Sequence, residues 1–217
     1  KLSKEITVAA KLGSIDSDTN PRLRSAIQAA RTVNMPKRNI ERAINKSKVS
    51  INVNYNTLVY EGFGPEKIAI IIEALTDNKN RTASNIRTIF QKNGGNLGES
   101  GVAAHQFKQA GVIRIDKNKI SDNDILELAI NAGAEDCSSS SSYHEIITIK
   151  ENFYKVKVEI EKKIQDFISS GIEWLPINKI SLDEEKTKSV LSFLEILEDD
   201  EDVQYVYANL EVGNNVL

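Results

Sequence analysis

The chain has 217 residues, of which 40% are hydrophobic, a composition typical of a globular protein with room for two or three small domains. Its longest apolar stretch, residues 68–75, is far shorter than the roughly 20 residues that cross a bilayer, so we expect no membrane span and no membrane partner. A single cysteine, Cys137, excludes an internal disulfide and favours a reducing, cytoplasmic location.

Charge is divided unevenly along the chain. Residues 1–48 hold 11 Lys and Arg against 4 Asp and Glu, whereas the remainder holds 17 against 27. Basic side chains release condensed counterions when they meet phosphates, and an acidic remainder limits non-specific binding. The distribution therefore points to DNA or ribosomal RNA as the partner, with a solvated helix face as an equally ranked alternative.

The basic segment predicts a bundle of three short helices. Apolar residues recur at helical spacing from Leu2, and Gly13 is expected to close this helix in the left-handed conformation. Asn20 and Pro21 suit the cap and the first turn of a second helix. A third helix is expected to open near residues 34–36, where Asn, Met and Pro precede another apolar stripe.

Basic residues are expected on the outer faces of the second and third helices. At 100° per residue, Arg38 and Arg42 lie opposite the inward-facing Ile40 and Ile44. Helix N-termini present unpaired N–H groups, so flanking cations can hold a phosphate there; the alternative is capping with solvated charges. The candidate nucleic-acid-binding residues are Arg22, Arg24, Arg31, Lys37, Arg38, Arg42 and Lys46.

The next segment, residues 49–56, is polar and rich in Asn, which is typical of a linker. The elements predicted after it are a strand at residues 57–63, a strand at 67–75, a helix around 83–90 and a strand at 102–107. We expect the first two strands to be joined by a turn in which glycine takes positive φ and Pro65 fixes the backbone. Gly94 and Gly95 should end the helix.

The segment between the second strand and this helix is a candidate anion site. A corner of this kind can bind an anion through its backbone amides, with arginine supplying charge and asparagine supplying hydrogen bonds. An ordinary capped turn uses the same residue types and is equally supported. The candidate residues at this corner are Asp77, Asn78, Asn80, Arg81 and Thr82.

The following stretch alternates in a way that predicts a βαββαβ module, which is the ferredoxin-like order. Its predicted elements are a strand at residues 112–116, a helix at 122–132, strands at 134–137 and 143–149, a helix at 151–169 and a strand at 172–178. Five serines at residues 138–142 are expected to form a flexible hairpin loop.

The last predicted elements are a helix at residues 183–197 and a strand at 203–210, separated by an acidic turn. A lone helix and strand cannot close a core, so we expect them to complete the sheet that starts at residue 57. The predicted fold class is α+β, a helical bundle followed by two α+β domains. The predicted domains are a basic three-helix domain at 1–50, an α+β domain at 51–110 plus 180–217, and an inserted ferredoxin-like domain at 111–179.

Sequence patterns for catalysis, metals and cofactors are missing. The glycine-bearing motifs match no phosphate-cradling fingerprint, and turn geometry explains them better. His105 and His144 have no Cys, His or Glu at metal-ligand spacing, so we expect both to be structural. We therefore predict no catalytic residues, no metal, no cofactor and no small-molecule substrate, and a protein that is not an enzyme.

Five motifs together resemble the YebC/PmpR family, in that family's order. They are Asn-Pro-Arg-Leu-Arg at residues 20–24, Asn-Met-Pro-Lys-Arg-Asn-Ile-Glu-Arg-Ala at 34–43, Tyr-Glu-Gly-Phe-Gly-Pro at 60–65, Thr-Asp-Asn-Lys-Asn-Arg-Thr at 76–82 and Gly-Gly-Asn-Leu-Gly at 94–98. The resemblance implies three domains, with two α+β domains around a cleft. It also implies a role in gene expression, as a DNA-binding transcriptional regulator or as a translational activator at the ribosome.

The chain departs from the family pattern in two places. The family's short basic segment before the first helix does not appear in this sequence, and serines replace its acidic hairpin after Asp136. We therefore expect a nucleic-acid-binding regulator, with DNA as the first candidate and the ribosome as the alternative. A less favoured reading is a protein-interaction adaptor that uses the acidic turn at residues 198–202 and the ferredoxin-like module.

Overall fold

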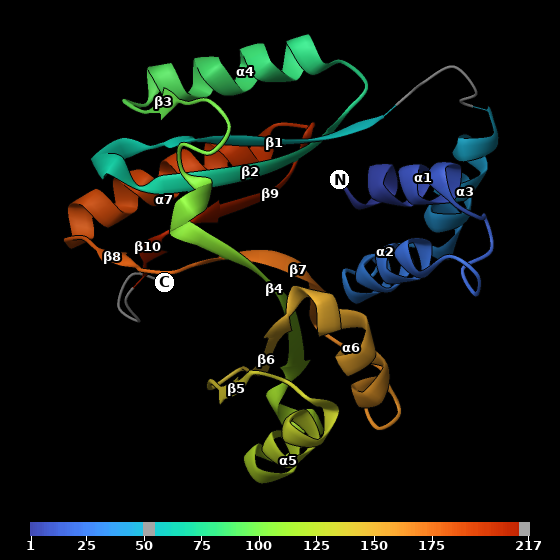
Figure 1. Ribbon diagram of the computed structural model, residues 1–217. Coiled ribbons are helices and arrows are strands. Elements are labelled where there is room, and N and C mark those ends of the chain that lie inside the picture. The colour runs from blue at the N-terminus through green and yellow to red at the C-terminus, as the bar shows by residue number, and fades with distance from the viewer. Residues whose placement is uncertain (50–54, 213–217) are drawn as a thin grey trace. The chain divides into compact units, whose positions relative to one another are not determined.

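The computed structural model describes residues 1–49 and 55–212, and Figure 1 labels its helices and strands. Its architecture is α+β, as the sequence predicts, with helices packed on mainly antiparallel sheets. The chain divides into two compact units: the first contains Lys1–Ala30, Asn34–Lys108 and the chain from Leu175 onward, and the second contains Arg31–Val33 and Gln109–Trp174. Of the predicted linker, residues 50–54 lie outside the described residues.

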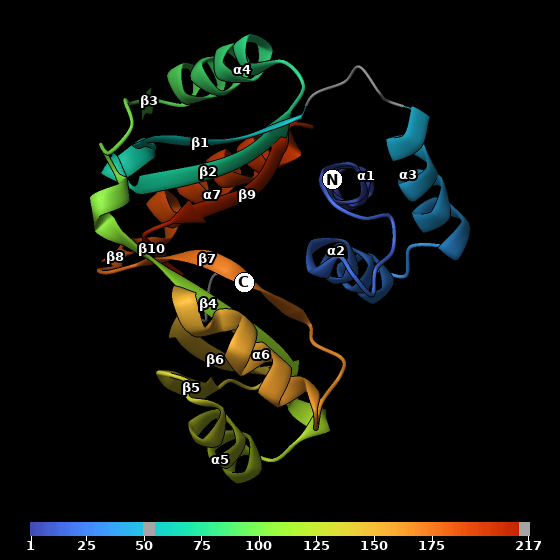
Figure 2. The ribbon, with the colours of Figure 1, turned by 45° about the vertical axis from the view of Figure 1, so that its right-hand side comes forward.

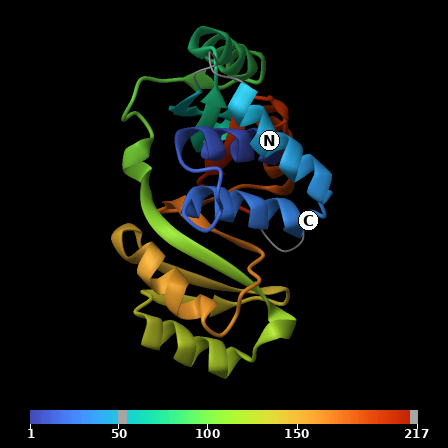
Figure 3. The ribbon, with the colours of Figure 1, turned by 90° about the vertical axis from the view of Figure 1, so that its right-hand side faces the viewer.

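The N-terminal helices are α1 (Leu2–Leu12), α2 (Pro21–Thr32) and α3 (Lys37–Val49), drawn in blue in Figure 3. Their core contains Ile6, Leu23 and Ile40, so each helix contributes from its apolar stripe. Asn20 caps α2 as predicted, because its Oδ1 accepts a 3.1 Å hydrogen bond from the Leu23 N–H.

The first unit also holds a four-stranded antiparallel sheet in the order β3-β1-β2-β9. Its strands are β1 (Asn56–Phe63), β2 (Ala69–Thr76), β3 (Asn96–Leu97) and β9 (Val203–Ala208). The pairing of β9 with β2 confirms that the C-terminal strand returns to the first sheet. Two short strands, β8 (Ile180–Ser181) and β10 (Leu210–Glu211), form a separate parallel pair.

Helices α4 (Lys79–Lys92) and α7 (Glu184–Asp199) share one core with this sheet. Ile70 and Ile72 of β2 belong to the core, and the rings of Phe90 and Phe193 meet edge to face with centroids 5.1 Å apart. The two helices thus cover the same face of the sheet and touch each other.

The second unit has the element order βαββαβ. Its four strands lie side by side in the order β5-β6-β4-β7, which can be followed in Figure 2. Its elements are β4 (Phe107–Asp116), α5 (Asp122–Ala132), β5 (Asp136–Ser139), β6 (Tyr143–Ile149), α6 (Phe153–Glu161) and β7 (Ser169–Pro176). Both helices pack on one face, where Ile113 and Ile146 meet Ile125 and Val156.

The predicted strand at residues 102–107 is wrong for most of its length, because the chain forms a 3₁₀ turn at Ala104–Gln106 and β4 starts at Phe107. The buried Glu61 carboxylate causes the turn by accepting the N–H groups of Gly101, Ala103 and Ala104 at 2.8–3.0 Å. Burial raises the pKa of Glu61, but these three hydrogen bonds and His105 lower it below its ordinary value.

Two predictions for the second unit are also corrected. The helix predicted at residues 151–169 ends at Glu161, because Ile164 and Phe167 are buried in the core from a segment without regular structure. The serines at 138–142 are not all loop, since β5 extends to Ser139 and only the last three connect it to β6.

Two glycines serve close packing where left-handed backbone was predicted. Gly13 has φ of −132°, and a Cβ there would lie 2.6 Å from the Asn20 side chain that closes the end of α1. In the turn between β1 and β2, positive φ falls on Glu66 and Lys67, whereas a Cβ on Gly64 would lie 2.8 Å from Ile70 and Phe193. Both positions need a small residue because another side chain occupies the space.

Candidate nucleic-acid interface

All seven predicted nucleic-acid-binding residues are exposed. Arg22, Arg24 and Arg31 lie on α2, and the other four lie on α3. On α3, the burial of Ile40 and Ala43 turns Arg38 and Arg42 toward solvent, one helical turn apart. The sequence pattern therefore places these two arginines as expected, on the outer face of the helix.

These basic residues differ in whether they form an ion pair with an acidic side chain of the same protein. Arg22 binds Glu5 with two hydrogen bonds of 2.7 and 3.2 Å, and Lys37 lies 3.9 Å from Glu41. Arg24, Arg38 and Arg42, by contrast, have no acidic partner among the described residues. These three guanidinium groups can bind a phosphate without first breaking an ion pair.

The corner before α4 is a tightly capped turn. Asn78 caps the helix by accepting a 3.1 Å hydrogen bond from the Arg81 N–H, and its own N–H donates to Thr76 Oγ1 at 2.9 Å. Thr82 is buried, while Asp77, Asn80 and Arg81 are exposed. The capped-turn reading of this segment therefore describes its backbone.

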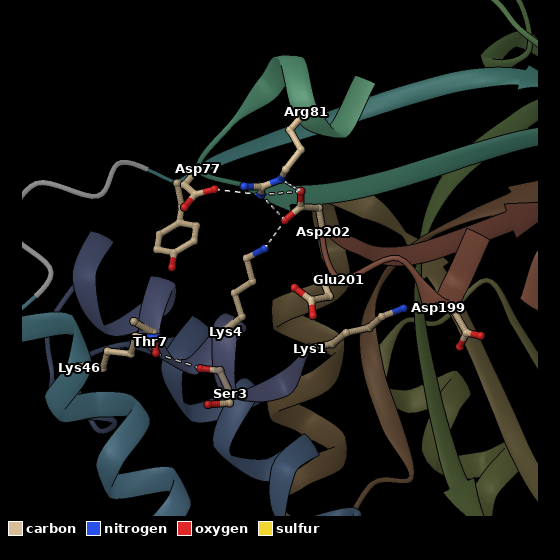
Figure 4. Close-up of a pocket in the computed structure, with 11 residues that line it drawn as sticks. Lys1, Ser3, Lys4, Thr7, Lys46, Asp77, Arg81, Asp199, Glu201 and Asp202 are labelled. Atoms are coloured by element: carbon tan, nitrogen blue, oxygen red, sulfur yellow. Dashed lines mark hydrogen bonds and ion pairs between the residues drawn. The ribbon is translucent and has the colours of Figure 1, made fainter. Parts of the chain in front are cut away.

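An internal carboxylate occupies the donors of this corner. Asp202, only 4% exposed, accepts hydrogen bonds from Thr82 Oγ1 at 2.7 Å and from the Arg81 guanidinium at 2.8–3.2 Å. Lys4 of α1 donates to the same carboxylate at 2.7 Å and Thr76 Oγ1 donates at 3.2 Å, so two cationic and two hydroxyl side chains converge on it. Figure 4 shows Lys4 and Arg81 pointing toward Asp202. Asp202 thus binds two of the five side chains, Arg81 and Thr82, that the sequence offers as candidates for an external anion.

This environment strongly favours the ionised form of Asp202. Burial raises the pKa of its carboxyl, but hydrogen bonds from Lys4, Arg81 and Thr82 outweigh burial and lower the pKa to about 2. Asp77 adds a second carboxylate on Arg81 at 3.0 Å. Arg81 therefore holds two acids of its own chain.

Asp202 and its partners Lys4, Arg81 and Thr82 form what we call the Asp202 cluster. Lys4, Arg81 and Asp202 line an open cleft of about 760 Å³ in the first unit. The cleft brings together three predicted site residues, Lys46, Asp77 and Arg81, and leaves Asn80 outside its lining. Four of its lining side chains are basic and four are acidic: Lys1, Lys4, Lys46, Arg81, Asp77, Asp199, Glu201 and Asp202. Because the charges balance, the cleft attracts anions less than the exposed faces of α2 and α3 do.

Sequence reasoning missed the roles of Asp202 and Lys4. A signal for Asp202 was available in the strand pairing, because the residue before β9 must lie at the end of β2 once the two strands run antiparallel. The Leu75 N–H indeed donates to the Asp202 carbonyl at 2.7 Å. Lys4 carries no comparable signal, since it is one of several lysines at helical spacing.

Groups suited to metal binding do not gather in the described part of the chain. No cluster of three or more His, Cys, Asp or Glu side chains suited to a metal ion is found there. His144 is fully buried, with one ring nitrogen 2.9 Å from the Ile120 carbonyl and the other 2.7 Å from Ser139 Oγ, so both ring nitrogens contact other groups of the chain. None of the described helices is long and apolar enough to cross a bilayer.

The fold and this site define an α+β protein with a basic helical bundle at its N-terminus. The family model described as the TACO1/YebC protein N-terminal domain matches residues 1–50, and the model of the TACO1/YebC second and third domain matches residues 55–210. The chain therefore belongs to the TACO1/YebC family.

Two relatives illustrate the similarity. A probable transcriptional regulatory protein of Pelagibacter ubique (strain HTCC1062) is 60% identical over 215 residues, which cover 99% of this chain and 89% of the relative. The crystal structure of a conserved hypothetical protein from Aquifex aeolicus is 40% identical, with a TM-score of 0.89 over 100% of this chain and 90% of the other.

Proposed function

We propose that this protein is a nucleic-acid-binding regulator of gene expression that acts on transcription by binding DNA. The observation that carries the proposal is the outer face of α2 and α3, where Arg24, Arg38 and Arg42 are exposed without an acidic partner among the described residues. Most contacts between proteins and DNA go to phosphates, and arginine suits them because it stays charged and binds in a fork.

The name of one relative supports a regulatory role. The Pelagibacter relative is called a probable transcriptional regulatory protein, and the high identity supports the same class for this chain. The alternative acceptor is ribosomal RNA, which offers the same phosphate chemistry. Backbone contacts do not by themselves distinguish DNA from RNA, so both are included as probes.

The acidic turn gives less support to a protein-interaction adaptor. Of the residues at 198–202, Asp202 is buried against Lys4 and Arg81, and Asp200 accepts a hydrogen bond from Asn85 at 3.3 Å. These acids serve internal contacts, which leaves fewer of them to meet a basic partner.

The test is the double variant Arg38→Ala with Arg42→Ala in the full chain. We expect its affinity for labelled duplex DNA or a ribosomal RNA fragment to fall on the order of tenfold or more at low salt, because two phosphate contacts are lost. The free energy of unfolding should change by less than ~0.5 kcal/mol, since both side chains are exposed. Wild-type affinity in a folded double variant would contradict the proposal.

We also propose the domain division at residues 1–50, 51–110 plus 180–217, and 111–179, with a ferredoxin-like inserted domain. Its support is the order βαββαβ and the separate core of the second unit. Replacing residues 111–179 with a short linker should leave a folded remainder with helical and strand signals in circular dichroism. An unfolded product would mean that the two parts depend on one core.

A further inference from the structure

Helix α4 is unusual among the surface helices of the acidic part of the chain. After residue 48 the chain holds 17 Lys and Arg against 27 Asp and Glu, yet α4 contains four basic residues and no acid. A solvated helix face commonly mixes charges, as in α7, where Lys188 lies 2.5 Å from Glu184, and in α6, where Lys157 lies 3.6 Å from Glu161. The sequence of α4 offers no such pairing.

One face of α4 is buried, and the opposite face is exposed to solvent. Thr82, Ile86 and Phe90 are buried toward the sheet at helical spacing, and Figures 1 and 2 show the helix lying over the strands. The opposite positions are exposed and polar, namely Asn80, Ser84, Arg87, Thr88, Gln91 and Lys92. We call this set the α4 outer face.

The basic residues of α4 are not equivalent. Arg81 is held by Asp202 and Asp77, and the neighbouring Asn85 donates to Asp200, so the acids near the helix contact this one edge. Arg87 and Lys92, by contrast, have no acidic partner among the described residues. They lie five residues apart, about 7.5 Å along the axis and about 140° around it, so they border the α4 outer face on its two sides.

We propose that the α4 outer face is a second nucleic-acid contact, which binds the sugar–phosphate backbone. Arg87 and Lys92 supply the charge, and the exposed Ser84 hydroxyl and Gln91 amide donate hydrogen bonds to phosphate oxygens between them. Neither Ser84 nor Gln91 carries a charge that would repel a phosphate. This inference rests on the proposed function, to which it adds a contact outside the N-terminal bundle.

The test is the double variant Arg87→Gln with Lys92→Gln in the full chain, titrated with labelled duplex DNA and, separately, with a ribosomal RNA fragment over a salt series. Loss of two phosphate contacts should make the slope of log affinity against log salt shallower by about 1.8 for duplex DNA. The matched control is Lys155→Gln with Lys163→Gln, two exposed lysines of the second unit that give the same change in net charge. Its slope should equal that of the wild type.

A charge-preserving variant, Arg87→Lys with Lys92→Arg, should keep most of the affinity. It shows whether a loss of affinity in the Gln variant comes from the lost charge or from misfolding.

Unchanged binding by the Gln variant, together with weakened binding by Arg38→Ala with Arg42→Ala, overturns the α4 contact and leaves the proposed function standing. Equal losses in the Gln variant and the lysine control also overturn it, because net charge alone then explains both. A wild-type chain that binds neither probe overturns the proposed function and this contact together.

Discussion

Two regions of the first unit combine arginine with the start of a helix, and their surroundings differ. Before α4, Arg81 binds Asp202 at 2.8 Å, whereas on α3 Arg38 and Arg42 face solvent without an acid partner in the described residues. The same residue types therefore give an internal cluster in one place and an open basic face in the other. What separates them is the carboxylate of Asp202, which lies 121 residues after Arg81 and directly before β9.

The cluster links elements that are distant in sequence. Asp202, next to β9, connects Lys4 of α1 with Arg81 and Thr82 of α4. A buried carboxylate with several charged donors stabilises the fold only while all partners are present, because a lost partner leaves the others unpaired. We therefore expect changes in the cluster to affect stability and changes in the open face to affect binding.

The largest effect on stability is expected for Asp202→Ala. The change removes the shared acceptor and leaves Thr82 Oγ1 buried without this carboxylate, so the free energy of unfolding should fall by about 2 kcal/mol in urea denaturation. The neighbouring exposed Glu201→Ala should cost less than ~0.5 kcal/mol and serves as the control. Equal stabilities for the two variants would mean that the cluster contributes nothing.

The pH dependence of stability sharpens the same point. Because the folded pKa of Asp202 is about 2, below its ordinary value of 3.8, its contribution is present above about pH 4 and is lost as pH falls toward 2. The difference in unfolding free energy between the wild type and Asp202→Asn should therefore shrink over this range. Glu61 titrates in both proteins and cancels in the difference, so a difference that stays constant with pH would speak against an ionised Asp202.

The smallest effect on stability is expected on the open face. Arg42→Gln should change the free energy of unfolding by less than ~0.5 kcal/mol while lowering affinity for duplex DNA. Arg81→Gln should do the reverse, destabilising the protein more than Arg42→Gln does and leaving affinity closer to that of the wild type. If Arg81→Gln weakened binding more than Arg42→Gln, the corner before α4 would be the external anion site that its sequence suggested.

Much of the fold follows from local pattern. The periodicity of residues 2–48 and of the βαββαβ stretch indicated the right elements, because amphipathic spacing reflects which face each element buries. The predictions failed where contacts between distant residues override local preference. The Glu61 carboxylate accepts hydrogen bonds from residues 101–104 and holds them in a turn where a strand was predicted. Phe167 packs into the core from a segment that was predicted to be helical. A single sequence does not reveal such partners.

The candidate site was predictable only in part. The exposure of Arg38 and Arg42 follows from helical spacing, since Ile40, which lies between them, must face the core. The occupation of the Arg81 corner depends on the pairing of β9 with β2, and therefore on tertiary structure. Whether the exposed face binds nucleic acid stays a prediction.

The most direct test of the account is the salt dependence of binding by the full chain. If the basic faces meet about four to six phosphates, log affinity for duplex DNA should fall linearly with log salt at a slope near −0.9 per contact, a loss on the order of a hundredfold or more between ~50 and ~200 mM. Contacts made mainly through apolar surface would be little affected by screening. A linear, steep dependence supports phosphate recognition by these faces, and a flat dependence would contradict it.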